Sequence, residues 1–207
     1  MGFRDLQYFS KALLAKQVWR LWKMEDSLTT RIMRAKYYPS CSIFDAQLSN
    51  KPSYAWRSIL KARGLVKEGL IWQIGNGESV PICGAKWLPI KSTHCVQSPV
   101  SILAGTAVVK DLIDQDSRWW NQQLLEDIFK PEEVRAIQSI PISSTNQQDT
   151  QIWGGTAKGE FSVRSAFHLA KELESRAQAE SSNRSRDNDV WKGIWKASLP
   201  NVVKNFL

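Results

Sequence analysis

Apolar residues near the start of the chain recur at the spacing of an amphipathic helix. Over residues 2–23, Leu14, Val18 and Leu21 fall on one line at 100° per residue, which predicts the packed face of one long helix. This line is flanked by Leu6, Leu13 and Trp22. The alanines and long straight side chains of the same stretch favour helix. We therefore expect the chain to begin with a helix that has one broad apolar side.

Two further helices are predicted in the next forty or so residues. One starts at Ser27 or Thr29 and runs to about Tyr38, where a following proline biases the preceding residue away from helix. The other has Ser53 as its N-cap and Gly69 as its stop, with apolar residues at helical spacing between them. Three amphipathic helices in succession therefore form the first third of the chain.

After the third predicted helix the pattern changes to short apolar runs broken by glycines. Residues 70–83 carry two such runs around an Asn-Gly pair, which is typical of a tight hairpin turn, and residues 150–163 are interpreted as a second hairpin. Helical spacing returns between residues 108 and 140 and again over 164–177. The predicted fold is mainly α with two small β-hairpins, an α+β class that has a basic helical N-terminal part.

We divide the chain into three segments on these patterns. Residues 1–68 form a basic helical segment, residues 69–148 a hairpin plus helical segment, and residues 149–207 a C-terminal segment.

Charge is concentrated in the first of these segments. Up to Glu68 there are 13 Lys and Arg against 5 Asp and Glu, an excess of 8, whereas the remainder has 15 of each. Such asymmetry favours a polyanionic partner, and nucleic acid is the commonest one. The alternative is an ordinary solvated surface. The predicted nucleic-acid-binding residues lie on the polar sides of the three helices: Lys16, Arg20, Lys23, Arg31, Arg34, Lys36, Arg57 and Lys61.

The sequence offers no pattern for an active site or a cofactor. The three cysteines, Cys41, Cys83 and Cys95, contain no Cys-x-x-Cys pair, so no metal site is predicted. Adjacent acidic pairs lie on or at the ends of predicted helices, whereas two-metal catalysis needs carboxylates brought together at one site. We therefore predict no catalytic residues, no cofactor and no metal, and we expect that the chain is not an enzyme.

Membrane insertion is not expected either. No apolar run approaches the roughly 20 residues that span a bilayer, and the N-terminus lacks the apolar stretch of a signal peptide. The predicted location is intracellular, in the nucleus or the cytoplasm, with no membrane partner.

Several stretches resemble one protein family in the same order along the chain. They include "GFRDLQYFSKALLAKQVWRLW", "SYAWRSILKARGLVKEGLIWQIGNGESVPI", "GEFSVRSAF" and "VWKGIWKASLPNVVKNFL". The combination resembles plant non-LTR (LINE-type) retrotransposon reverse transcriptase proteins, in the segment that follows the polymerase core and runs into the start of the reverse-transcriptase zinc-binding domain. Gln73 departs from that pattern, since arginine is usual there.

The resemblance implies that residues 149–207 are the truncated start of a reverse-transcriptase zinc-binding-like domain. In this interpretation, apolar residues of that segment lack part of their burial partners: Phe161, Val163, Phe167, Trp191, Trp195, Phe206 and Leu207. The polymerase carboxylates of the family lie before such a segment and its zinc ligands after it, so neither is expected within residues 1–207, and ribonuclease H carboxylates are also missing. The leading hypothesis is a non-catalytic retrotransposon fragment that binds RNA or an RNA–DNA duplex without sequence preference. Other segments of the parent polyprotein are further expected partners. The alternative is a structural or protein-interaction module with no nucleic-acid role.

Overall fold

Six α-helices dominate the computed structural model, which describes residues 3–48, 52–90, 93–99, 105–114, 117–143 and 147–184. The elements are α1 (Phe3–Lys23), α2 (Leu28–Tyr37), α3 (Tyr54–Gly69), β1 (Leu70–Gln73), the 3₁₀ helix η1 (Val109–Leu112), β2 (Ile113–Asp114), β3 (Trp119–Trp120), α4 (Gln122–Ile128), α5 (Pro131–Gln138), β4 (Thr150–Trp153) and α6 (Val163–Arg184). The mainly helical α+β class predicted from the sequence is confirmed.

The first helices begin where local chemistry predicts. Ser27 caps α2 by accepting a hydrogen bond from the Thr30 backbone N–H at 3.2 Å. Ser53 caps α3 in the same way by accepting one from the Trp56 N–H at 3.2 Å. Such caps satisfy backbone donors that have no partner within the helix.

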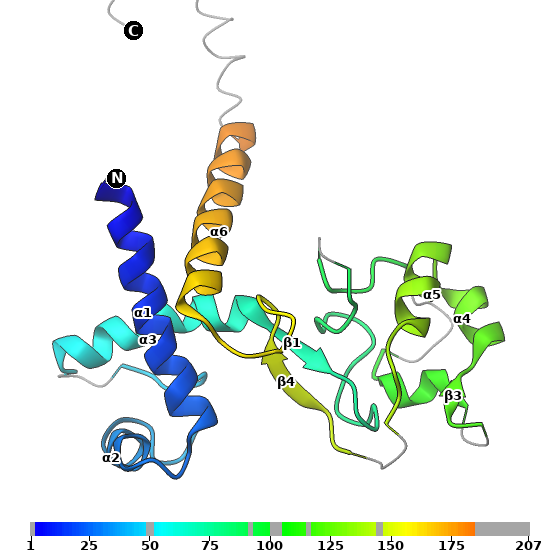
Figure 1. Cartoon of the computed structure of the whole chain (residues 1–207), viewed down its shortest axis with the longest axis horizontal. Coiled ribbons are helices and arrows are strands. Elements are labelled where there is room, and N and C mark those ends of the chain that lie inside the picture. The colour runs from blue at the N-terminus through cyan, green and yellow to red at the C-terminus, as the bar shows by residue number, and fades with distance from the viewer. Residues whose placement is uncertain are drawn as a thin grey trace, which may run out of the picture.

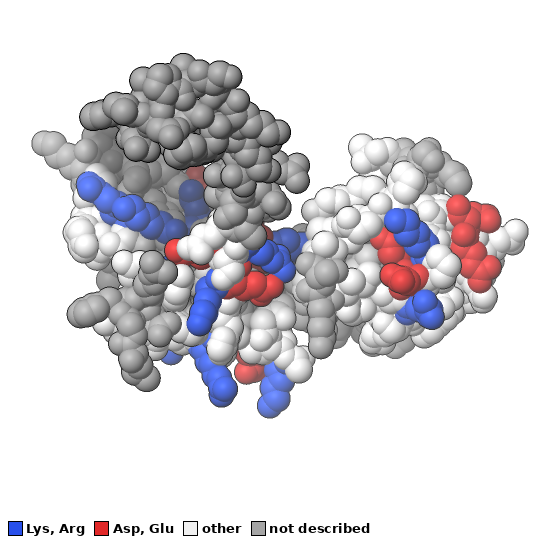
Figure 2. Space-filling view, turned by 90° about the horizontal axis from the view of Figure 1, so that it is seen from above, with Lys and Arg blue, Asp and Glu red and all other residues white. Residues whose placement is uncertain are grey.

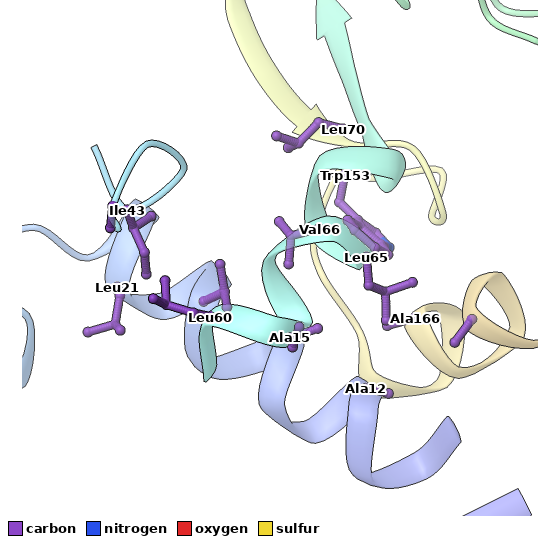
Figure 3. Packing of buried hydrophobic residues seen from close by; sticks show 14 of the residues in the cluster. Ala12, Ala15, Leu21, Ile43, Leu60, Leu65, Val66, Leu70, Trp153 and Ala166 are labelled. Carbon is purple, nitrogen blue, oxygen red and sulfur yellow. The ribbon is translucent and has the colours of Figure 1, made fainter. Parts of the chain in front are cut away.

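A first hydrophobic core joins α1, α2, α3 and α6 into what we call the helical lobe. Figure 1 shows α1 crossing α3, with α6 beside α1. In Figure 3, Trp153 from the end of β4 lies near Leu65 and Ala166, and it is fully buried. A Cβ atom added to Gly69 would lie 2.3 Å from the Trp153 ring, so the absence of a side chain at the end of α3 lets the indole fit.

The two predicted hairpins are wrong in their pairing. β1 pairs antiparallel with β4, with Leu70 opposite Trp153, so each predicted hairpin supplies one strand of a single long-range sheet. The Asn-Gly segment after β1 instead folds around Asp149, whose carboxylate accepts hydrogen bonds from the backbone N–H groups of Gly75, Gly77 and Ser79 at 2.7, 2.9 and 2.9 Å. These three bonds hold the segment as a loop rather than as a turn between two strands.

Residues between β1 and β4 form a second lobe around a separate hydrophobic core, drawn from residues 74–142. In Figure 1 the β1–β4 pair lies between the two lobes. Within the second lobe, the region predicted as helical over residues 108–140 also contains the paired strands β2 and β3, and α4 begins only at Gln122. The reason is local: Trp120 pairs with Ile113, and the Asn121 side chain then caps α4 by accepting from the Leu124 N–H at 3.1 Å.

The segment after β4 finds burial partners in the first helices. Phe161 stacks on Trp19 of α1 at 5.6 Å between ring centroids, and Phe167 meets Tyr8 edge-on at 6.1 Å. Phe161, Val163 and Phe167 therefore have partners in the core of the helical lobe, where they are partly buried, and the expectation that part of their burial is missing stays a prediction. The other residues named with them lie outside the described part of the chain: Trp191, Trp195, Phe206 and Leu207. The three-segment division stays a prediction.

Candidate nucleic-acid interface

The packed side of α1 is rotated from the predicted one. Its fully buried row comprises Ala12, Ala15 and Val18 and ends at Leu21, which is 6% exposed. Leu6 and Leu13, which were predicted to flank the packed face, are 60% and 42% exposed. The small alanines let α3 and α6 approach α1 closely, and hydrophobicity alone does not indicate this.

The three predicted cations of α1 have different surroundings. Lys16 and Arg20 are exposed, and neither has an ion-pair partner among the described residues. Lys23 Nζ instead lies 4.4 Å from the Trp22 ring centroid and donates a hydrogen bond to the Gln151 carbonyl oxygen at 2.9 Å. Burial lowers the pKa of the Lys23 ammonium. Lys23 therefore joins α1 to the start of β4, and its ammonium group is already engaged by these contacts.

The three basic residues of α2 all reach solvent. Arg34 lies 3.8 Å from a Glu25 carboxylate oxygen, and both side chains are more than half exposed. Exposed ion pairs of this kind contribute only about 0–1 kcal/mol to stability, so Glu25 holds the Arg34 side chain only weakly. Lys36 lies 5.3 Å from the centroid of the Tyr37 ring, and Arg31 has no ion-pair partner in the part of the chain that is described.

The two predicted cations of α3 are one helical turn apart on its solvent side. Arg57 and Lys61 are both exposed, and residues at i and i+4 share a helix face. Their positions agree with the helical pattern, but they differ in what surrounds them. Lys61 faces α1 across a groove, and Arg57 does not line it.

That groove, which we call the α1–α3 groove, has a volume of about 900 Å³ and is open to solvent. Its lining comprises Leu6, Gln7, Ser10, Lys11, Leu14, Tyr54, Ser58, Lys61 and Ala62. Among the described residues, two lysines and no carboxylate therefore face this space. Tyr54, at the first turn of α3, is 84% exposed.

Sequence reasoning missed Lys11, the second cation of the α1–α3 groove. A signal was present, because Lys11 stands three and seven residues before Leu14 and Val18, in line with the apolar face. A lysine at such a position buries its methylene stem and extends its ammonium past the edge of the packed surface. Of the eight predicted residues, only Lys61 lines this groove.

The groove has the chemistry of a polyanion site. Two ammonium groups without an opposing carboxylate attract phosphates, and an exposed aromatic ring offers a stacking surface for a base. Elsewhere the positive charge is more scattered. On the face shown in Figure 2, the Lys and Arg side chains drawn in colour lie near Asp and Glu side chains over both lobes.

Other kinds of site were sought among the described residues. There, no three or more His, Cys, Asp or Glu side chains come together as a group that could hold a metal ion. No helix in the described ranges combines the length and apolar character needed to cross a membrane.

Two plant proteins are similar to this chain, one over part of its length and the other over its whole length. An uncharacterized mitochondrial protein of Arabidopsis thaliana is 40% identical over 88 residues, which are 42% of this chain and 57% of that protein. A candidate ribonuclease H protein of the same species is 26% identical over 215 aligned positions, which cover 100% of this chain and 33% of that protein. The chain thus spans from one third to little more than half of the length of the curated relatives it matches.

No family model matches the chain, and no solved structure matches it. A relative named for ribonuclease H is consistent, at a coarse level, with the resemblance to plant transposon proteins.

Proposed function

We propose that the chain is a non-catalytic part of a retrotransposon reverse transcriptase-like protein that binds RNA or an RNA–DNA duplex without sequence preference. The α1–α3 groove is the principal contact surface, with phosphates on Lys11 and Lys61. The exposed cations outside the groove add weaker phosphate contacts: Lys16, Arg20, Arg31, Arg34, Lys36 and Arg57.

The composition of the groove carries this proposal. Its described lining has two lysines, no carboxylate and an aromatic ring that is 84% exposed. Its position within the segment that holds all of the net positive charge supports the same conclusion. Phosphate contacts position a nucleic acid without reading its bases, so little sequence preference is expected.

Fluorescence anisotropy with labelled oligonucleotides tests the proposal. The double substitution Lys11→Gln and Lys61→Gln is compared with Lys158→Gln and Lys171→Gln, which removes the same charge from two exposed positions outside the groove. We expect the groove variant to bind single-stranded RNA and an RNA–DNA duplex at least about tenfold more weakly, because charge-assisted contacts contribute about 1.5–3 kcal/mol each. Equal loss in both variants would show that net charge alone, not the groove, attracts the nucleic acid.

A primer-extension assay tests the non-catalytic part of the proposal. The full chain is incubated with a primed RNA template, deoxynucleotides and magnesium, and an unextended primer is the expected result. Extension above a heat-inactivated control would contradict the proposal.

A protein-interaction role is the second candidate, and a different observation favours it. Leu6, Phe9 and Leu13 on α1 are exposed by 60%, 48% and 42%, and Leu28 and Ile32 on α2 by 70% and 56%. Exposed apolar groups on adjacent turns are typical of interaction sites when they form a contiguous patch. Sedimentation of the full chain, with and without Leu28→Glu and Ile32→Glu, separates the two roles: a self-association lost in this variant, together with no RNA binding, would favour the interaction module.

A further inference from the structure

A second cleft lies between the two lobes. It has a volume of about 700 Å³, and its walls come from the end of α3, the turn after β4, one side of α6 and the segment around His94. Both histidines of the chain, His94 and His168, line it. Cavities of this size accommodate small molecules as large as a nucleotide.

The charges of the cleft leave one cation without a partner. Lys86 Nζ lies 2.6 Å from a Glu68 carboxylate oxygen, and Arg176 lies 2.6 Å from a Glu172 carboxylate oxygen. Arg164 also lines the cleft, is exposed, and has no ion-pair partner among the described residues. Among the described residues that line the cleft, cations therefore outnumber carboxylates by one.

Arg164 stands on a firmly held part of α6. Ser162 Oγ accepts a hydrogen bond from the Ser165 backbone N–H at 3.1 Å and so fixes the first turn of the helix. The buried Trp153 indole N–H donates to Ser165 Oγ at 2.8 Å, which joins this turn to β4. His168 lies one turn beyond Arg164 on the same helix face. The "GEFSVRSAF" motif and the histidine that directly follows it thus present one cation and one imidazole from a fixed backbone.

His94 lies on the wall of the cleft that faces α6, and one of its contacts shows which ring nitrogen carries the hydrogen. His94 Nδ1 lies 2.8 Å from the Leu88 carbonyl oxygen, and because a carbonyl only accepts, Nδ1 carries the hydrogen. Nε2 is then the ring nitrogen left for a ligand. His94 also has a φ of 56°, a conformation that non-glycine residues rarely adopt and that often occurs at functional sites.

We propose that this cleft binds a phosphate group held by Arg164 and His168 from α6, with Nε2 of His94 on the facing wall accepting a hydrogen bond from a hydroxyl group of the same ligand. The guanidinium fork matches two oxygens of a phosphate, and the first turn of a long helix adds partial positive charge. The phosphate belongs either to a free molecule of nucleotide size or to the end of an RNA strand. This site does not depend on RNA binding by the α1–α3 groove, since the two share no lining residue.

Isothermal titration calorimetry on the full chain tests the site with four probes: adenosine monophosphate, adenosine, and a short RNA with either a 5′-phosphate or a 5′-hydroxyl group. We expect adenosine monophosphate or the 5′-phosphorylated RNA to bind more tightly than its counterpart without the phosphate. The Arg164→Gln variant should lose at least about tenfold of that difference. Lys171→Gln on the same helix removes one charge outside the cleft and should retain it.

The outcomes are distinct. A phosphate-dependent gain with adenosine monophosphate alone supports the site and identifies a free ligand, whereas a gain with the RNA alone supports it and identifies a strand end. The imidazole ¹⁵N signals of His94 and His168 should move on addition of adenosine monophosphate or the phosphorylated RNA to the unmodified chain, a readout that needs no variant. No phosphate-dependent gain with either probe, or equal loss in Arg164→Gln and Lys171→Gln, would overturn the proposal.

Discussion

Replacing Asp149 should loosen the connection between the two lobes. Its carboxylate accepts three backbone hydrogen bonds, at 2.7 Å from Gly75, 2.9 Å from Gly77 and 2.9 Å from Ser79. Gly75 and Gly77 are buried, so their N–H groups would find no ready replacement in water. Asp149→Ala removes all three acceptor contacts at once, whereas Asp149→Asn keeps one carbonyl oxygen.

The size of the effect follows from the number and burial of these bonds. A hydrogen bond to a charged group contributes about 1.5–3 kcal/mol, and the exposed Ser79 bond contributes less than the two buried ones. We therefore expect Asp149→Ala to lower the free energy of unfolding by about 3 kcal/mol and Asp149→Asn by about half of that. Asp127, which is exposed on α4, provides the matched control, and Asp127→Ala should change stability by no more than about 0.5 kcal/mol.

Urea unfolding followed by circular dichroism measures the global change, and amide hydrogen exchange locates it. Exchange at Gly75, Gly77 and Ser79 should accelerate in Asp149→Ala, while the amides of α1 should be less affected. A loss of less than about 0.5 kcal/mol, with unchanged exchange at these three amides, would refute the idea that Asp149 holds the loop.

Two further predictions concern the cores. Glu133 is buried; burial raises the pKa of its carboxyl, but hydrogen bonds donated by the Ser98 hydroxyl and by backbone N–H groups together outweigh burial and lower it. Because the pKa of Glu133 is lowered in the folded protein, its ionised carboxylate stabilises the fold above the ordinary glutamate pKa, and this stabilisation is lost as pH falls through the folded pKa. We therefore expect Glu133→Gln to destabilise the fold by about 2 kcal/mol at pH 7 and by less in acid. Gly69→Ala should cost about 1–3 kcal/mol, since its Cβ would lie 2.3 Å from the Trp153 ring, whereas Gly64→Ala in the same helix meets nothing within 4 Å and should be neutral or stabilising in thermal unfolding. Glu133→Gln with the same pH profile as the unmodified chain, or equal effects of the two alanines, would contradict these assignments.

Local chemistry made the helices predictable. Ser27 and Ser53 act as caps within three residues of the N–H groups that they bind, and Pro131 opens α5, so a short window of sequence holds the whole interaction. The strands were harder to predict, because Leu70 pairs with Trp153 across the entire second lobe. Residues flanking an Asn-Gly pair favour a hairpin locally, and only the distant Asp149 carboxylate directs this segment elsewhere.

In the candidate site, too, some residues could be placed from the sequence, whereas others depend on contacts between distant segments. Helical periodicity was enough to place Lys16 and Arg20 on an exposed side. The α1–α3 groove depends on how two helices cross, so the facing of Lys11 and Lys61 is a tertiary property that spacing does not encode. Lys23 was predicted as a binding residue, but it donates a hydrogen bond to the Gln151 carbonyl oxygen, and this contact between residues far apart in the sequence could not be predicted from helical spacing.

The salt dependence of RNA binding tests the central claim most directly. Each phosphate contact on a single strand contributes about −0.7 to the log–log slope of affinity against salt concentration. The Lys11→Gln and Lys61→Gln variant should therefore have a slope about 1.4 units flatter than the unmodified chain, whereas Lys158→Gln with Lys171→Gln should leave the slope unchanged. Anisotropy titrations across a salt series measure both slopes, with circular dichroism confirming that each variant is folded. The same slope in the groove variant and the unmodified chain would contradict phosphate binding in the α1–α3 groove.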